Sequence, residues 1–150
     1  MLSTILLMLE GTLVGNEVCV ALIHSTLYKL PDECHLRVAK PLAGLFGRVM
    51  PFWYIVVFAL SIAECYLLRG AGPYIGHLLL ASTGLFGLSI VFTLIGPVPI
   101  NNRIARLNPT DPPANWLELR KRWDRLHLVR VTVLLVALFL LAFGEVMVPR

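Results

Sequence analysis

The chain has 150 residues, of which 57% are hydrophobic and 15% are charged, whereas soluble domains carry about 25% charged residues. Its mean hydropathy of +0.78 and its four long apolar runs exclude a soluble globular domain, because too little polar surface would remain to cover those runs. The formal net charge of +4 requires no nucleic-acid partner, since basic loops are also typical of membrane proteins.

The apolar runs cover residues 4–28, 49–68, 77–100 and 126–148. Each is close to the roughly 20 residues that cross about 30 Å of hydrocarbon. Only helices and closed barrels satisfy the backbone there, and these runs are too continuous for the alternating strands of a barrel. The sequence therefore predicts an all-α membrane protein, a single domain whose fold is a four-transmembrane-helix bundle.

The segment between the first two runs, residues 29–48, has a pattern of its own. Pro31, Asp32 and Glu33 form a typical helix start, in which Asp32 can cap the first turn. Apolar residues then recur at helical spacing, at Leu36, Ala39, Leu42, Ala43 and Phe46. This pattern predicts a short amphipathic helix at the cytoplasmic membrane interface, between the first and second spanning helices.

Basic residues indicate the orientation of the bundle. Residues 29–48 carry four of them and residues 101–125 carry six. The connection between the second and third runs offers only Arg69, and the C-terminal end offers only Arg150. The positive-inside rule then predicts that both long loops are cytoplasmic and that both termini lie outside.

Prolines and aromatic residues mark the ends of the later helices. Pro97 and Pro99 are expected to break the third helix before Asn101. Residues 116–125 are expected to begin a helix that runs on into the fourth span. The aromatic residues near helix ends are interpreted as interfacial anchors, namely Trp53, Tyr54, Trp116 and Trp123.

The first predicted helix carries several polar side chains within the membrane. Such residues are costly unless they face the interior of the bundle, so each is a candidate site residue. Glu10, Glu17 and His24 are seven residues apart, which places them on nearly one face of the helix. Asn16 broadens this polar stripe.

The fourth predicted helix begins with a second polar group. Asp124, His127 and Arg130 step by three residues and share one face. From the rise of 1.5 Å per residue, Glu17 and Arg130 lie at similar depth, so the sequence predicts an ion pair between them. His24, His127, Asn101 and Asn102 are expected to cluster on its cytoplasmic side. The alternative is that the pair only locks two helices together and Asn101 caps the third helix.

A metal site is a further interpretation of this cluster. Two histidines and a carboxylate form the ligand set of non-haem iron, and copper and zinc also use such ligands. Glu17 and His24 are too far apart on one straight helix to share an ion. The candidate ligands are therefore His24, His127 and Asp124, and haem bound through either histidine is the less favoured alternative.

These residues fall in short motifs that resemble the anthrone oxygenase-like family of small four-helix membrane proteins. The resemblance is strongest in the Pro-x-Asn-x-x-Ile segment that begins at Pro99 and in Trp-x-x-x-His-x-x-Arg, which Trp123, His127 and Arg130 match. The other matching stretches are Gly15-Asn16-Glu17 followed by His24, Leu30-Pro31-Asp32, Gly47-Arg48-Val49-Met50-Pro51-Phe52-Trp53 and the residues between Trp123 and Arg130.

The resemblance implies oxidation of an anthrone to an anthraquinone, or of a similar polyketide-like aromatic compound. The acidic benzylic C–H of an anthrone gives an electron-rich enolate that can reduce O₂, so no cofactor is required. His127 or His24 is the candidate base. Asn101, Asn102 or Arg130 is the candidate partner of the anionic oxygen. Glu17 completes the catalytic set, and Asn16 and Trp123 join Asn102 as candidate substrate-binding residues.

Two other functions remain open on the same residues. The chain is either a membrane binding or accessory subunit whose polar cluster is structural, or a small proton-linked carrier that uses Glu10, Glu17 and His24. The expected partners are a hydrophobic small molecule that enters from the bilayer and membrane lipid. A homo-oligomer is left open.

Overall fold

The computed structural model describes residues 1–148, except for the side chains of residues 24 and 25. This part of the chain contains helices and no strand. Its helices are α1 (Leu2–Leu27), α2 (Asp32–Leu67), α3 (Pro73–Ile95), α4 (Pro97–Ile104) and α5 (Trp116–Val146). Four candidate membrane spans follow from their length and hydropathy: α1, α2, α3 together with α4, and α5.

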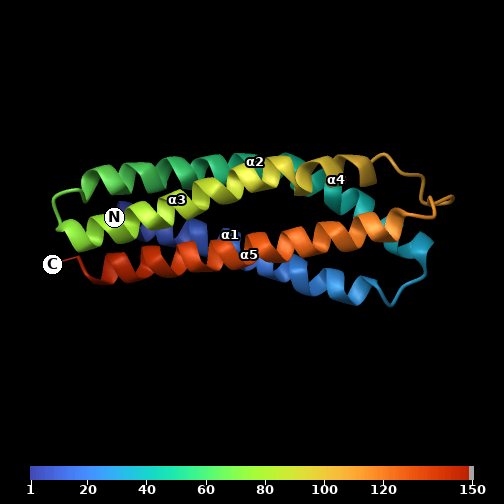
Figure 1. The fold of residues 1–150 in the computed structure, drawn as a ribbon, viewed down its shortest axis with the longest axis horizontal. Coiled ribbons are helices and arrows are strands. Elements are labelled where there is room, and N and C mark those ends of the chain that lie inside the picture. The colour runs from blue at the N-terminus through green and yellow to red at the C-terminus, as the bar shows by residue number, and fades with distance from the viewer. Residues whose placement is uncertain (149–150) are drawn as a thin grey trace.

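The long helices lie side by side in an elongated bundle (Figure 1). Both chain ends lie at one end of the bundle, and α4 lies at the other, together with the α1–α2 and α4–α5 connections (Figure 1). This arrangement confirms the predicted all-α bundle with four helices long and apolar enough to cross a membrane. It also defines the chain as a multi-pass membrane protein.

The amphipathic segment differs from the prediction at both of its ends. It is helical from Asp32, but the N-cap is Pro31 and no side chain caps the helix, so the predicted cap by Asp32 is wrong. The helix also does not end before Val49 and forms the first half of α2. Its apolar face is buried inside the protein, since Leu36 belongs to a core cluster with Ile104 and Trp116. The bundle itself therefore covers this face. The segment is part of a candidate spanning helix and does not form a separate helix at the membrane interface.

The prolines after α3 also act differently from the prediction. Helix α3 ends at Ile95, Gly96 interrupts the helical backbone with φ −101° and ψ −80°, and Pro97 begins α4. Proline is favoured in a first helical turn because the N–H that it lacks has no intrahelical partner there. The third helix therefore breaks before Asn101, as expected, but it ends at Ile95 and not at residue 100, and the segment after the break is helical instead of a loop. Asn101 and Asn102 lie within α4.

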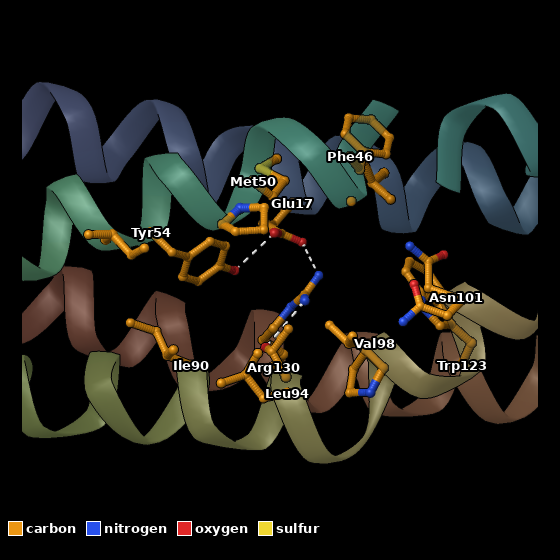
Figure 2. Close-up of a pocket in the computed structure, with 17 residues that line it drawn as sticks. Glu17, Phe46, Met50, Tyr54, Ile90, Leu94, Val98, Asn101, Trp123 and Arg130 are labelled. Atoms are coloured by element: carbon orange, nitrogen blue, oxygen red, sulfur yellow. Dashed lines mark hydrogen bonds and ion pairs between the residues drawn. The ribbon is translucent and has the colours of Figure 1, made fainter. Parts of the chain in front are cut away.

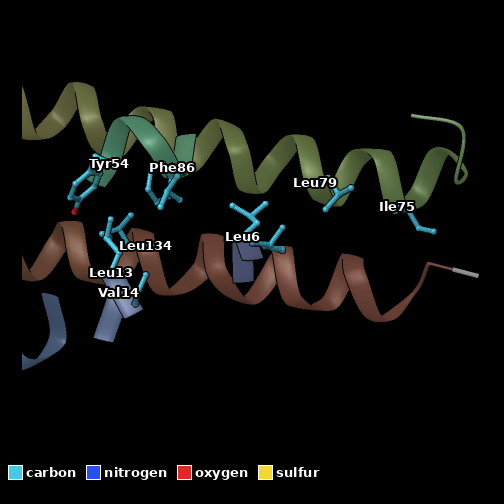
Figure 3. Packing of buried hydrophobic residues seen from close by; sticks show 10 residues of the cluster. Leu6, Leu13, Val14, Tyr54, Ile75, Leu79, Phe86 and Leu134 are labelled. Carbon is cyan, nitrogen blue, oxygen red and sulfur yellow. The ribbon is translucent and has the colours of Figure 1, made fainter. Parts of the chain in front are cut away.

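Two apolar clusters hold the helices together. The larger one lies in the half of the bundle that contains the chain ends and joins α1, α2, α3 and α5 (Figure 3). Helices α3 and α5 approach closely, because Ser82 Oγ donates to the Ala137 carbonyl over 2.7 Å and Gly144 leaves room for Leu79. Such contacts between small residues are typical of membrane helices. Helix α5 starts at Trp116, as expected, and brings residues 116–130 onto the bundle.

Candidate functional site

An ion pair between α1 and α5 lies inside the bundle. The Arg130 guanidinium donates from Nη2 to Oε2 of Glu17 over 2.6 Å, and only 2% of Glu17 and 7% of Arg130 is exposed. The surrounding medium solvates buried charges poorly, so an unpaired charge in a membrane helix is costly. Such charges are tolerated when they are paired. The predicted ion pair between Glu17 and Arg130 is therefore confirmed.

Tyr54 and Thr93 complete the surroundings of this pair. The Tyr54 hydroxyl donates to Oε1 of Glu17 over 2.9 Å, and Nη1 of Arg130 donates to Oγ1 of Thr93 over 3.3 Å. Tyr54 is buried, so its interpretation as an interfacial anchor is wrong. Because α2 starts at Asp32 and is unbroken, residue 54 lies well inside this helix and faces the interior.

His127 lies beside the ion pair and contacts both of its members. One ring nitrogen, Nε2, is 3.0 Å from the backbone carbonyl oxygen of Glu17, and Nδ1 is 2.9 Å from Nη2 of Arg130. A carbonyl oxygen can only accept and a guanidinium can only donate. The contacts to the carbonyl oxygen and the guanidinium suit an imidazole with its proton on Nε2, and Nδ1 also lies 3.3 Å from Oε2 of Glu17. Both ring nitrogens therefore face groups of the protein.

The spacing of the Trp-x-x-x-His-x-x-Arg motif now has a structural explanation. Residues at positions i, i+4 and i+7 share one face of a helix. The Trp123 indole stacks on the His127 ring, with 4.7 Å between ring centroids and 16° between planes. The motif therefore forms a row on α5 that fixes the guanidinium of Arg130 against Glu17.

A cavity of about 280 Å³ lies next to the ion pair. This volume is close to the lower end of the range of about 300–1,000 Å³ that is typical of small-molecule pockets. Its polar floor contains Glu17, Arg130 and Trp123, and its walls come from α2 on one side and from α3 and α4 on the other (Figure 2). The walls are mainly apolar, with Phe46, Met50, Ile90, Leu94 and Val98 among them. Neither His127 nor Glu10 lines the cavity.

Asn101 and Asn102 line the cavity from α4, as candidate binding residues should. Nδ2 of Asn101 donates to the Ala43 carbonyl over 3.2 Å and so connects α4 to α2. Asn16 does not line the cavity, and its Nδ2 lies 4.0 Å from the sulfur of Met50. The sequence identified these polar residues, but the wall residues Met50 and Val98 carry no signal that distinguishes them from other apolar positions.

Asp124 belongs to a different cluster, near the connection between α1 and α2. It accepts a hydrogen bond from Nη2 of Arg120 over 2.8 Å and another from the Tyr28 hydroxyl. Burial, followed by the hydrogen bond to Asp124, raises the pKa of Tyr28 above its usual range. The Tyr28 hydroxyl therefore stays protonated and remains a donor, which ties the end of α1 to α5.

The predicted metal ligands are not brought together. Among residues 1–148, apart from the side chains of residues 24 and 25, no three His, Cys, Asp or Glu side chains are grouped so that they could hold a metal ion. His24 lies outside the described side chains, so only His127 and Asp124 can be compared with the prediction. Nδ1 of His127 faces the Arg130 guanidinium, which would repel a second cation. These two side chains do not fit the predicted metal site.

Glu10 is the other buried acidic residue of α1. It is 1% exposed, and neither carboxyl oxygen has a hydrogen-bond partner among the described residues. Its Cα lies about 10 Å along the helix from that of Glu17, seven residues at 1.5 Å each. A proton-linked carrier, the alternative function, would have to relay protons across this distance. The side chain of His24, the third residue of that relay, is outside the described residues.

We expect His127→Ala to lower the free energy of unfolding by about 2–4 kcal/mol, because it leaves a void beside Trp123 and removes the contacts to Glu17 and Arg130. Thermal unfolding in detergent micelles would measure this loss. His77→Ala is the control, since His77 is exposed on α3, and its effect should stay within about 0.5 kcal/mol. Equal unfolding midpoints for both variants would mean that His127 does not support the ion pair.

The fold and the site define a small multi-pass membrane protein with a buried ion pair at the floor of an apolar cavity. Residues 43–140 match the family model described as Anthrone oxygenase, so the chain belongs to the anthrone oxygenase family. The matched range includes the cavity walls and the motif on α5, whereas Glu17 precedes it. No curated protein and no solved structure matches the chain significantly. Family membership indicates a membrane oxygenase-like role.

Proposed function

We propose that this protein oxidises an anthrone-like aromatic compound to the corresponding quinone with O₂, in the cavity beside Glu17 and Arg130. The observation that carries the proposal is the ion pair at the floor of an apolar cavity in a member of the anthrone oxygenase family. An apolar wall suits an aromatic ring system, and the floor offers both a proton acceptor and a cation.

Glu17 is the proposed base, in place of the histidines. It lines the cavity, whereas His127 does not. When the Glu17 carboxylate accepts the benzylic proton, the substrate becomes an enolate, and the negative charge moves to the substrate oxygen. Arg130 then pairs with this oxygen instead of the carboxylate. The buried guanidinium therefore keeps one anionic partner throughout, which avoids an uncompensated charge in a medium of low dielectric constant.

The remaining steps use O₂ as the oxidant. The enolate passes one electron to O₂, and the carbon radical and superoxide combine to form a C–O bond. The peroxide takes the proton from Glu17. Glu17 then removes the second benzylic hydrogen as a proton, the O–O bond breaks, and hydroxide leaves and is protonated to water. The CH₂ group and one O₂ thus give one C=O group and one H₂O, with the carboxylate restored.

Asn101 and Asn102 are proposed to orient the substrate. Their amide groups lie on the α4 side of the cavity, where they can bind a hydroxyl or carbonyl group on the ring system. We also propose that the end of the bundle that contains α4 is cytoplasmic and that both termini lie outside. The basic residues of segments 29–48 and 101–125 support this orientation.

The test is O₂ uptake and absorbance with anthrone as the substrate and the protein in lipid nanodiscs. We expect one O₂ consumed per anthraquinone formed, at a rate far above that of protein-free nanodiscs, in which anthrone also reacts slowly with O₂. A rate equal to that of protein-free nanodiscs would contradict the proposal. It would favour the accessory subunit whose ion pair only fixes the arrangement of helices.

A further inference from the structure

The cavity has one exposed side. Its lining residues from α1 and α5 are buried, whereas α2, α3 and α4 contribute exposed ones. Ile55 on α2 is 63% exposed and Leu94 on α3 is 60% exposed. The exposed lining residues are Gly47, Pro51, Ile55, Leu94 and Asn102. The cavity therefore opens between α2 and the pair of α3 and α4, opposite its polar floor.

The surface around this opening is apolar. Phe52 next to it on α2 and Ile95 next to it on α3 are also strongly exposed. Both helices belong to candidate membrane spans, and exposed apolar side chains of a spanning helix contact lipid acyl chains. A molecule that approaches the opening along this face therefore comes from the bilayer.

We infer that the cavity opens laterally to the lipid bilayer and that molecules enter it through a portal between α2 and the pair of α3 and α4. This inference rests on the proposed function and deepens it, because it specifies the substrate class. The substrate is a flat, uncharged molecule that dissolves in lipid. It lies across the floor, so that its carbonyl oxygen meets Arg130 and its benzylic CH₂ group, on the opposite side of the central ring, meets Glu17, while the apolar rings contact the walls.

Gly47 keeps one end of the portal open. A Cβ atom at this position would lie 3.9 Å from Nδ2 of Asn101 on the opposite wall, which is ordinary van der Waals contact. Alanine therefore fits, but a longer side chain would extend into the space between α2 and α4. The hydrogen bond from Asn101 to the Ala43 carbonyl holds this amide in place, so it cannot move aside without losing that bond.

Binding kinetics separate a portal from the rest of the site. Anthraquinone, the product-like probe, would be mixed with the protein in nanodiscs, and quenching of tryptophan fluorescence would report its association and dissociation. Gly47→Leu should slow both rates by about tenfold or more, while Kd changes by less than about threefold. Gly47→Ala is one control. Gly44→Leu is the second, since Gly44 does not line the cavity and its added Cβ would meet no atom within 4 Å.

The outcomes distinguish the portal from the proposed function. Unchanged rates in Gly47→Leu, or a raised Kd with faster dissociation, would overturn the portal even if anthrone is turned over. Slowed binding without turnover by the wild-type protein would support the portal and overturn the oxygenase. Anthraquinone-2-sulfonate tests the lipid route, because its charge keeps it in water. Binding of this anion as rapid as that of anthraquinone would overturn access from the bilayer.

Discussion

Glu17→Gln is expected to lower the free energy of unfolding by about 3–5 kcal/mol, because it leaves the Arg130 cation buried without its anionic partner. A guanidinium cannot lose its proton to relieve this cost. Turnover of anthrone should fall by about 10²–10⁴-fold, because the amide cannot accept a proton. Chemical denaturation in mixed micelles and the O₂ assay in nanodiscs would measure the two effects.

A second substitution separates these effects. The double variant with Glu17→Gln and Arg130→Gln has no buried charge at this site, so most of the lost stability should return, to within about 2 kcal/mol of the wild type. Turnover should remain as low as in Glu17→Gln. If the double variant were no more stable than the single one, the ion pair would not be the origin of the loss. Full turnover in Glu17→Gln would exclude Glu17 as the base.

Arg130→Lys is expected to lower kcat by about 10²–10³-fold with little change in KM, because the oxygen of the substrate becomes fully anionic only after proton transfer. Lysine keeps the charge but not the planar fork of donors. In the native protein this fork contacts Glu17, His127 and Thr93 at once. An ammonium group cannot reproduce these directions from a single nitrogen.

The control for this variant is Arg125→Lys, since Arg125 lies on the same helix and is exposed. Its kcat should equal that of the wild type. The stability of Arg130→Lys should fall by only about 1–2 kcal/mol, because a cation still faces Glu17. Wild-type kcat in Arg130→Lys would mean that positive charge alone suffices and that the geometry of the guanidinium plays no part in the reaction.

The ion pair between Glu17 and Arg130 could be predicted because it depends on few quantities. Charges within a membrane bundle need partners, and the helical rise gives the depth of each residue from its position in the chain. The motif on α5 was visible for a related reason, since its spacing places three side chains on one face. Sequence spacing did not show that Arg130 lines the cavity while His127 lies behind it.

Other parts of the site depend on where helices begin and end. Tyr54 resembled an interfacial residue as long as a helix was expected to start near Val49, and the unbroken α2 places it inside the bundle. Proline gives an ambiguous signal, because it both ends helices and begins them. At Pro97 it begins α4, so Asn101 occupies a cavity wall instead of a loop.

The cavity draws its proposed reactive pair and most of its walls from different helices. Glu17 and Arg130 lie on α1 and α5, whereas most of the apolar wall, Asn101 and Asn102 lie on α2, α3 and α4. Deleting one residue at Gly96 would turn α4 by about 100° relative to α3 and carry both amides away from the cavity, leaving the reactive pair unchanged. Under the proposed function, substrate preference can therefore change through substitutions in α2, α3 and α4, while Glu17 and Arg130 stay the same on α1 and α5.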